Sequence, residues 1–302
     1  DLKTSAGQKV WFMEDHSVPV FSLVFSFRAG DIQAPLEKKG VASLLSAMLD
    51  EGTKNMTTQQ LHEKLQDLGV EFNANTSSDR LVISFRTPRV HLKEAIALLK
   101  AILYTPRFDE QAFDRIKHAT ISGLENQIKR PEWIAMRSLQ KNIFGNHPCV
   151  TSVLAKPEEI KKITLQDLSS FMKNHFAKDS LVVSVCGDIQ PRELLALLDD
   201  VFSALPEKGI YLTIPEAIFS TKGVEQMIET PHPQSTVYFA HPALHHTHPD
   251  FMKLYLIDHV LGGGSQSLLM DDIREKRGLV YSVGTGIQVT NATAIMMGSM
   301  QS

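Results

Sequence analysis

The feature that most limits the fold of this chain is a pattern that occurs twice. Two strand-like segments precede an apolar helix near the N-terminus, and the same order returns about 200 residues later, far beyond the period of a solenoid repeat. Apolar residues at every second position indicate strands, and apolar residues three or four positions apart indicate helices. The repetition predicts two similar α/β domains. The segments are Val10–Met13, Val18–Phe27 and 40–53 in the first copy, and Gln226–Ile228, Val237–Ala240 and 249–261 in the second.

A short linker separates the two copies. Leu205-Pro206-Glu207-Lys208-Gly209 combines proline, glycine and charged residues directly after a predicted helix. The chain has 302 residues, of which 43% are hydrophobic, and this length allows two domains to bury separate cores. We therefore expect a first domain over residues 1–206 and a second over 210–302. The second copy stops at Ser302, before its last helices and strands, so we expect it to be truncated or abbreviated.

Further local signals place the other elements. Thr57-Thr58-Gln59-Gln60 resembles a capping box, Asp109 is a favourable N-cap, and the apolar run Leu181–Cys186 is typical of a central strand. The strands Val10–Met13 and Val18–Phe27 are expected to pair around a turn at residues 14–17. The remaining expected helices are 57–69, 92–103, 109–128, 132–144, 165–175, 191–202 and 266–276, and the remaining expected strands are 70–75, 81–86, 281–289 and 293–298.

Composition excludes several classes of function. A net charge of -3 without a Lys/Arg stripe argues against nucleic-acid binding. The chain has no run of eighteen apolar residues, so no membrane span is expected. Cys149 and Cys186 permit at most one disulfide and match no metal motif, and both are expected to be buried as small apolar residues. Asp1-Leu2-Lys3 is no signal peptide, although it is compatible with a mature end left by removal of one.

The helix expected over residues 40–53 has a specific frame. It reads Gly-x-Ala-x-x-x-x-x-Met-Leu-x-x-Gly-Thr from Gly40 to Thr53, with Ala42, Leu45 and Leu49 on one stripe. Gly52 is placed to end it. Taken alone, such a helix is most often a core helix.

A second ordered segment lies between residues 262 and 283. Three glycines begin it, and Arg274 and Tyr281 follow seven positions apart. A guanidinium and a phenol can both donate hydrogen bonds to a peptide carbonyl or to a developing oxyanion. The glycines form no phosphate loop, because no Gly-Lys-Ser/Thr follows them. We expect them to allow tight packing where helices meet.

Both segments resemble the pitrilysin-like (M16) metallopeptidases, and together they extend the resemblance over essentially the whole chain. The resemblance implies an α+β fold of two similar M16-type (LuxS/metallohydrolase-like) domains, each a mainly antiparallel sheet with helices packed on it. In active members the first helix carries His-x-x-Glu-His, with two zinc-binding histidines and a glutamate as general base. The corresponding positions here are Ser43, Ser46 and Ala47, which offer no imidazole or carboxylate.

The third zinc ligand of the family, a glutamate, is missing as well. The family's spacing leads to Gly123, with Glu125 two residues further along the same predicted helix. Two positions along a helix turn a side chain to a different face, so Glu125 is expected to be a solvated or salt-bridged residue and not a ligand. The resemblance therefore implies that this chain holds no zinc.

The second motif is retained. In active members the arginine and the tyrosine contact substrate peptide across from the zinc and stabilise the tetrahedral intermediate, and the resemblance gives these roles to Arg274 and Tyr281. The alternative is a surface arginine paired with Asp271 and a plain strand aromatic. A new serine nucleophile at Ser43 or Ser46 is disfavoured, because no Gly-x-Ser-x-Gly elbow surrounds either residue.

Loss of the zinc ligands with retention of the Arg/Tyr pair resembles the non-catalytic subunit of heterodimeric bacterial M16 peptidases. In those a sister chain carries His-x-x-Glu-His, and the two chains enclose the peptide. The resemblance implies no independent catalysis, a zinc-bearing M16 partner subunit and an unstructured peptide substrate, which the first domain would hold along a sheet edge. The alternative is a structural or peptide-binding homologue without a role in proteolysis. An independent active peptidase would require ligands that this chain lacks.

Two further expectations concern histidines and location. His241, His245, His246 and His248 cluster in a loop without acidic or thiol partners nearby, so a functional metal site is not expected there. Bacterial members of this type are often exported, which together with the start at Asp1 favours the periplasm, with the cytoplasm as the alternative.

Overall fold

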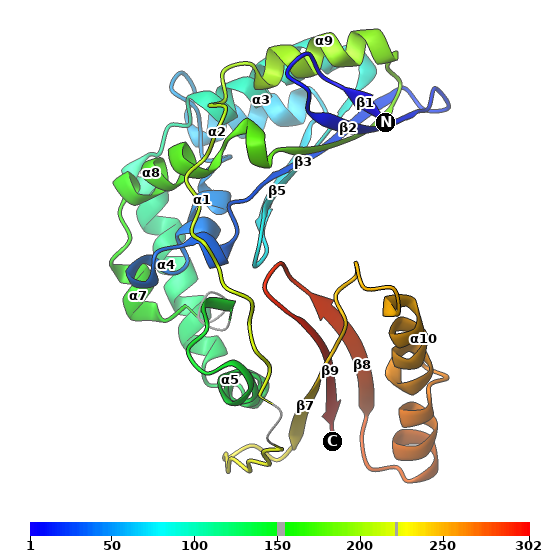
Figure 1. The fold of residues 1–302 in the computed structure, drawn as a ribbon. Coiled ribbons are helices and arrows are strands. Elements are labelled where there is room, and N and C mark those ends of the chain that lie inside the picture. Colours follow the sequence, from blue (N-terminus) through cyan, green and yellow to red (C-terminus); the bar gives the residue numbers. More distant parts are fainter. Residues whose placement is uncertain (150–154, 221–222) are drawn as a thin grey trace. The chain divides into compact units, whose positions relative to one another are not determined.

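The computed structural model describes residues 1–149, 155–220 and 223–302. The chain forms two compact units. The first comprises residues 1–121 and 155–213, and the second comprises 122–154 and 214–302 within the described ranges (Figure 1). The helix α4 (Glu110–Gln127) begins in the first unit and ends in the second.

A six-stranded mixed sheet forms the centre of the first unit. Its strand order is β1-β2-β6-β3-β5-β4. The pair β2/β6 is parallel, and the other neighbouring pairs are antiparallel. The sheet is therefore mainly antiparallel, as the family resemblance implies. The strands are β1 (Leu2–Lys3), β2 (Lys9–Glu14), β3 (Val20–Phe27), β4 (Glu71–Thr76), β5 (Leu81–Pro88) and β6 (Val182–Gly187).

The predicted hairpin of the first two long strands is wrong. The strand β6, far away in the sequence, lies between β2 and β3 and pairs with both. Both Phe21 and Asp15 approach the end of β6 at Gly187, whose φ of 138° and close approach to the Val20 carbonyl require glycine. The prediction that Leu181–Cys186 forms a central strand is confirmed.

One face of this sheet forms the core, and the other is open. Phe21, Leu23, Phe25 and Phe27 of β3 are buried, because successive side chains of a strand point to opposite faces of the sheet. The helices α3 (Leu92–Tyr104) and α9 (Pro191–Phe202) lie side by side over this face (Figure 1). On the opposite face Trp11, Met13 and Val24 are exposed in this unit.

The helix α1 (Val41–Met48) packs against α8 (Leu165–His175) and β4. Gly40 precedes it with φ of 90°, a left-handed conformation that favours glycine. The capping box at Thr57 and the N-cap at Asp109 are confirmed. The other elements are α2 (Thr58–Asp67), α7 (Pro157–Lys161), α8 (Leu165–His175) and the 3-10 turns η1 (Asp31–Gln33), η2 (Leu36–Lys38), η3 (Arg89–His91) and η4 (Lys178–Ser180).

The chain after α9 remains hydrogen-bonded to the first unit past residue 209, where the predicted linker ends. We call residues 206–212 the strap. Its backbone pairs with residues 174, 178 and 179, and Tyr211 donates a hydrogen bond to Asp179 at 2.6 Å. The buried side chain of Gln33 accepts from Leu212 N at 2.7 Å and donates to Leu212 O at 3.3 Å. The strap is therefore an ordered part of this unit.

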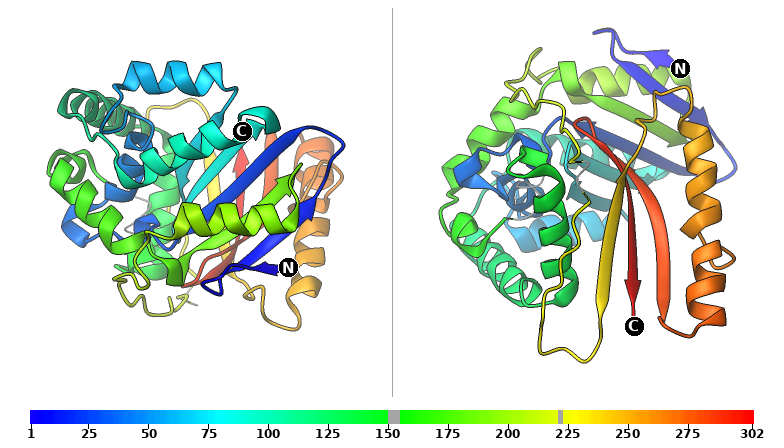
Figure 2. Two further views of the ribbon diagram at one scale, coloured as in Figure 1. Left: turned by 90° about the horizontal axis from the view of Figure 1, so that it is seen from above. Right: turned by 60° about the horizontal axis from the view of Figure 1, so that its bottom comes forward.

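The second unit contains a three-stranded antiparallel sheet in the order β7-β9-β8. The helix α5 (Pro131–Phe144) contacts β7, whereas α10 (Phe251–Gly262) and the π-helix η5 (Met270–Lys276) contact β8 (Figure 2). The predicted strand Gln226–Ile228 is wrong, because it pairs with no strand of the described sheet. The predicted helix 266–276 is confirmed over residues 268–276, which are α-helical at 268–269 and π-helical from Met270 to Lys276. The strands are β7 (Thr236–Pro242), β8 (Ser282–Val289) and β9 (Ala294–Gln301).

The helix α10 turns apolar side chains outwards. Ile257 is 59% exposed, whereas Asp258 next to it is buried. A Cβ at Gly262 would lie 2.4 Å from Thr285 Oγ1, so this glycine packs α10 against strand β8. The expectation that the glycines serve contacts between helices is therefore wrong for Gly262. The exposed apolar residues of α10 are Met252, Tyr255, Leu256, Ile257 and Val260.

The structure also bears on the predictions about membrane spans and cysteines. Among the described residues, no helix combines the length and the apolar character needed to cross a membrane. Cys149 and Cys186 form no disulfide with each other. Cys149 is buried as predicted, but Cys186 is only half-buried, because it lies on the open face of the sheet.

Candidate functional site

The three positions of the lost zinc motif lie on α1, and none of their side chains is a metal ligand. Ser43 Oγ donates to Asp31 Oδ1 at 3.2 Å and lies 3.2 Å from Thr76 Oγ1. Ser46 Oγ is buried and donates to the Ser43 carbonyl of its own helix at 2.8 Å. Ala47 is exposed. The two hydroxyls are thus engaged in internal hydrogen bonds.

Gly123 lies on α4 and is exposed, with no atom within 4 Å of a Cβ built there. Glu125 is exposed as well, in agreement with its predicted solvation. Zinc in proteins takes imidazole, thiolate or carboxylate ligands. The side chains at Ser43, Ser46, Ala47 and Gly123 supply none of these, so the positions do not fit a zinc ion.

Asp31 is the unusual group beside α1, and sequence reasoning missed it. Burial raises the pKa of Asp31 to about 6, although the Ser43 hydroxyl favours the charged form. This carboxyl group, next to the first lost ligand position, therefore changes its charge near pH 6 and is mostly ionised at pH 7. Nothing in the local sequence distinguishes Asp31 from other loop aspartates, because its burial depends on the fold.

A second buried carboxylate lies just after α1. Glu51 is 7% exposed, and its Oε1 lies 2.5 Å from Arg115 Nη2 of α4. Its other oxygen, Oε2, is buried without a hydrogen-bond partner among the described residues. This ion pair joins α4 to the residues that follow α1, and its Glu51 carboxylate is shielded from water. The sequence analysis did not identify it.

In the second unit, Arg274 and Tyr281 are both available to solvent. Arg274 lies on η5, where its guanidinium is 3.3 Å from Glu275, and its side chain is 46% exposed. Tyr281 immediately precedes β8 and is 73% exposed. Its backbone N–H donates to Gln301 at 2.8 Å, and its hydroxyl has no partner among the described residues. The elements η5 and β8 are in contact, so Arg274 lies on an element that neighbours the strand following Tyr281.

The surface ion pair considered for Arg274 is absent from this region. Asp271 pairs with Lys276 at 2.5 Å, and Asp272 pairs with Arg277 at 3.2 Å. The exposed pair with Glu275 is expected to contribute little. Arg277 thus pairs with a residue one helical turn away, whereas the ion pair of Arg274 is with its sequence neighbour Glu275. The π-helical geometry of η5 is common at functional sites.

The histidine loop of the second unit shows a ring contact but no ligand cluster. His245 and His246 have ring centroids 4.0 Å apart, and His241 Nδ1 lies 2.8 Å from the Pro242 carbonyl. Within the described ranges, no group of three or more His, Cys, Asp and Glu side chains has a geometry that could hold a metal ion.

Comparison with known proteins gives consistent results for both halves of the chain. Residues 9–157 match the family model described as insulinase (peptidase family M16). Residues 162–301 match the model described as peptidase M16 inactive domain.

Among curated proteins, a relative from Helicobacter pylori named non-peptidase homolog YmxG is 30% identical over 277 residues. The match covers 91% of this chain and 63% of the relative. A protein from Arabidopsis thaliana named probable mitochondrial-processing peptidase subunit beta is 23% identical, with 77% of this chain and 44% of the relative covered. This chain thus spans less than two thirds of the length of these relatives.

Solved structures extend the likeness to the fold. A peptidase M16 inactive domain from Pseudomonas fluorescens matches with a TM-score of 0.90 and 29% identity, over 100% of this chain and 73% of that one. A chain of complex III2 from Candida albicans matches with a TM-score of 0.76 at 16% identity, over 99% of this chain and 70% of that one. The second likeness concerns the fold alone.

Proposed function

Because the chain belongs to the M16 (insulinase) peptidase family, we propose that it is the non-catalytic subunit of a heterodimeric zinc peptidase. In this role it supplies Arg274 and Tyr281 to a peptide bound at the zinc site of a partner subunit. The observation that carries the proposal is the contrast between the two motifs. The α1 positions lack zinc ligands, whereas Arg274 and Tyr281 are solvent-exposed donors.

The chemistry of the pair supports this role. A guanidinium always carries charge, and a tyrosine hydroxyl donates a hydrogen bond at neutral pH. Two donors directed at a peptide carbonyl would stabilise the oxyanion that forms when water attacks it. Neither group needs a metal in its own chain. Zinc would be held by the partner subunit, and this chain's residues would only bind and polarise the peptide.

The first unit also supports peptide binding. The strand β4 is the last strand of its sheet, and Glu71, Asn73 and Asn75 are exposed along it. An extended peptide adds to such an edge through main-chain hydrogen bonds. In this proposal the complex acts on unstructured peptides in the periplasm.

The test is a peptidase assay on an unstructured peptide, with zinc measured in every sample. The chain is assayed alone, the zinc-bearing M16 relative alone, and the two together. We expect turnover from the mixture and none from this chain alone. Arg274→Ala and Tyr281→Phe should each lower turnover about 100-fold or more, as expected for loss of an oxyanion donor.

Arg277→Ala is the matched control, because Arg277 lies on the same segment but pairs with Asp272. It should retain the activity of the mixture. Zinc and turnover from this chain alone would refute the proposal. A complex that forms without any gain in activity would instead establish the alternative, a structural or peptide-binding homologue, which the name of the Helicobacter pylori relative favours.

A further inference from the structure

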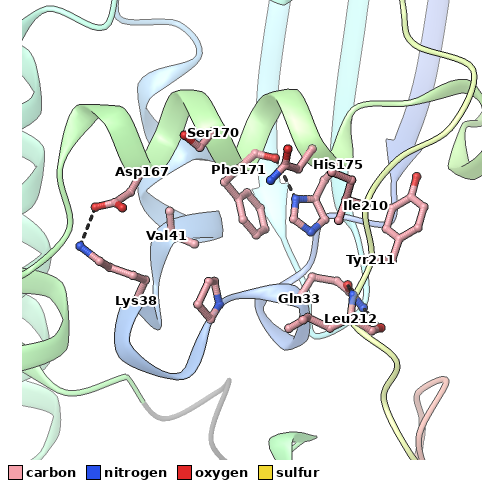
Figure 3. A pocket seen from close by; sticks show the side chains of 12 residues that line it. Gln33, Lys38, Val41, Asp167, Ser170, Phe171, His175, Ile210, Tyr211 and Leu212 are labelled. Carbon is pink, nitrogen blue, oxygen red and sulfur yellow. Dashed lines mark hydrogen bonds and ion pairs between the residues drawn. The ribbon is translucent and has the colours of Figure 1, made fainter.

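The first unit contains a pocket that the proposed function does not use. It lies between the turns η1 and η2, the start of α1, the helix α8 and the strap (Figure 3). Its volume is about 200 Å³. An engineered apolar cavity of about 150 Å³ in another protein holds a benzene ring. The pocket is therefore large enough for one aromatic ring system.

The walls of the pocket are apolar because its polar residues bond elsewhere. Val41, Phe171 and Leu212 present carbon atoms to the space. The amide of Gln33 is occupied at both ends by the backbone of Leu212. Lys38 pairs with Asp167 at 2.8 Å at one end. The two charges at that end therefore offset each other.

His175 is the exception. It is 5% exposed, stacks on Phe171 at a centroid distance of 4.0 Å, and its Nδ1 lies 2.8 Å from the Phe171 carbonyl. A carbonyl can only accept, so Nδ1 carries the proton. Burial lowers the pKa of His175, so the ring is neutral at pH 7. In this tautomer Nε2 is a hydrogen-bond acceptor.

That acceptor has no protein partner. Among the described residues His175 has the single hydrogen bond through Nδ1, and Figure 3 shows the other ring nitrogen directed away from α8, toward Gln33 and the pocket. An acceptor that has no protein partner can be satisfied by water or by a donor of a bound ligand. The pocket thus combines an apolar body with one fixed acceptor.

We propose that this pocket binds an aromatic ring with one hydrogen-bond donor, a phenol or an indole, whose donor is directed at His175 Nε2. The ring fills the space between Val41, Phe171 and Leu212. The same chemistry is available from a free small molecule and from a tyrosine or tryptophan side chain of a peptide. This site does not involve Arg274 or Tyr281, and the inference does not depend on the proposed function.

The test is an NMR titration of the full chain with phenol, benzene and N-acetyltyrosinamide. Phenol should bind about three- to tenfold more tightly than benzene, the difference expected for one hydrogen bond. Shifts should centre on Val41 and His175. Binding of phenol alone identifies a small-molecule ligand, and binding of N-acetyltyrosinamide as well identifies a side chain. Failure of both phenol and N-acetyltyrosinamide to bind at millimolar concentration would overturn the inference.

Two variants locate the interaction. His175→Phe keeps the ring on Phe171 but removes the acceptor, so phenol should fall to the affinity of benzene while benzene binding stays unchanged. Val41→Phe fills the pocket and should abolish both. His118→Phe, at an exposed histidine of α4, is the control and should match the wild type. Phenol that still binds more tightly than benzene to the His175→Phe variant would refute the role of His175. Loss of partner-dependent turnover in Arg274→Ala with unchanged phenol binding would separate the two sites.

Discussion

Asp31 is predicted to reduce the stability of the folded protein at neutral pH. Its pKa is about 6 in the folded protein, compared with 3.8 for an ordinary aspartate. A difference of this size corresponds to about 3 kcal/mol. The folded state holds the proton more tightly than the unfolded state. The folded protein is therefore not penalised by Asp31 below about pH 4, where the carboxyl group is protonated in both states. Stability is lost as the pH rises from about 4 through about 6, because the carboxyl group must then ionise in its buried position.

Asp31→Asn should remove this penalty, because an amide oxygen can still accept from Ser43. We expect the variant to be more stable than the wild type by about 3 kcal/mol near pH 7.5, and the gain to fall by about 2 kcal/mol near pH 4.5. Urea unfolding of both proteins at the two pH values measures the difference.

Asp67→Asn, at an exposed aspartate of α2, is the matched control and should give a small effect that does not vary with pH. Two results would contradict the reasoning. One is an Asp31→Asn variant that is no more stable than the wild type near pH 7.5. The other is a gain of the same size at both pH values, which would assign it to packing rather than to ionisation.

Three further predictions concern the fold and are measured by urea unfolding. Gln33→Ala removes both hydrogen bonds to Leu212 and should destabilise the protein by about 1–3 kcal/mol; an unchanged midpoint would show that the strap is held without it. Gly187→Ala places a Cβ 2.1 Å from a β3 carbonyl oxygen at φ of 138° and should cost at least about 2 kcal/mol, whereas Gly264→Ala, in open space, should be tolerated. Thr57→Ala removes a helix cap and should cost about 1 kcal/mol; a neutral result would mean that water replaces the cap.

Helices and caps of the first unit follow from the sequence because their signals are local. The strand order does not, because a parallel partner such as β6 can be inserted from more than 150 residues away, as the pairing of Val10 with Val183 shows. Gln226–Ile228 has apolar residues in strand-like order, yet Met227 is 88% exposed and finds no neighbouring strand. Local preference alone does not form a sheet.

The candidate sites divide in the same way. Arg274 and Tyr281 are recognisable from the sequence because their spacing lies within one continuous segment. The raised pKa of Asp31 and the free acceptor of His175 depend on which segments fold over them, and no local pattern encodes this burial. Gln33 belongs to this group, since its partner Leu212 is 179 residues away.

The strap has a practical consequence for separating the first unit by protein engineering. A fragment cut at the Pro206 linker would lose Tyr211 and Leu212, which line the pocket beside His175. It would also leave the buried amide of Gln33 without its two hydrogen-bond partners on Leu212. Retaining residues through Thr213 preserves these contacts. The excision point that keeps this unit intact therefore lies after the strap, several residues beyond the position that its proline and glycine suggest.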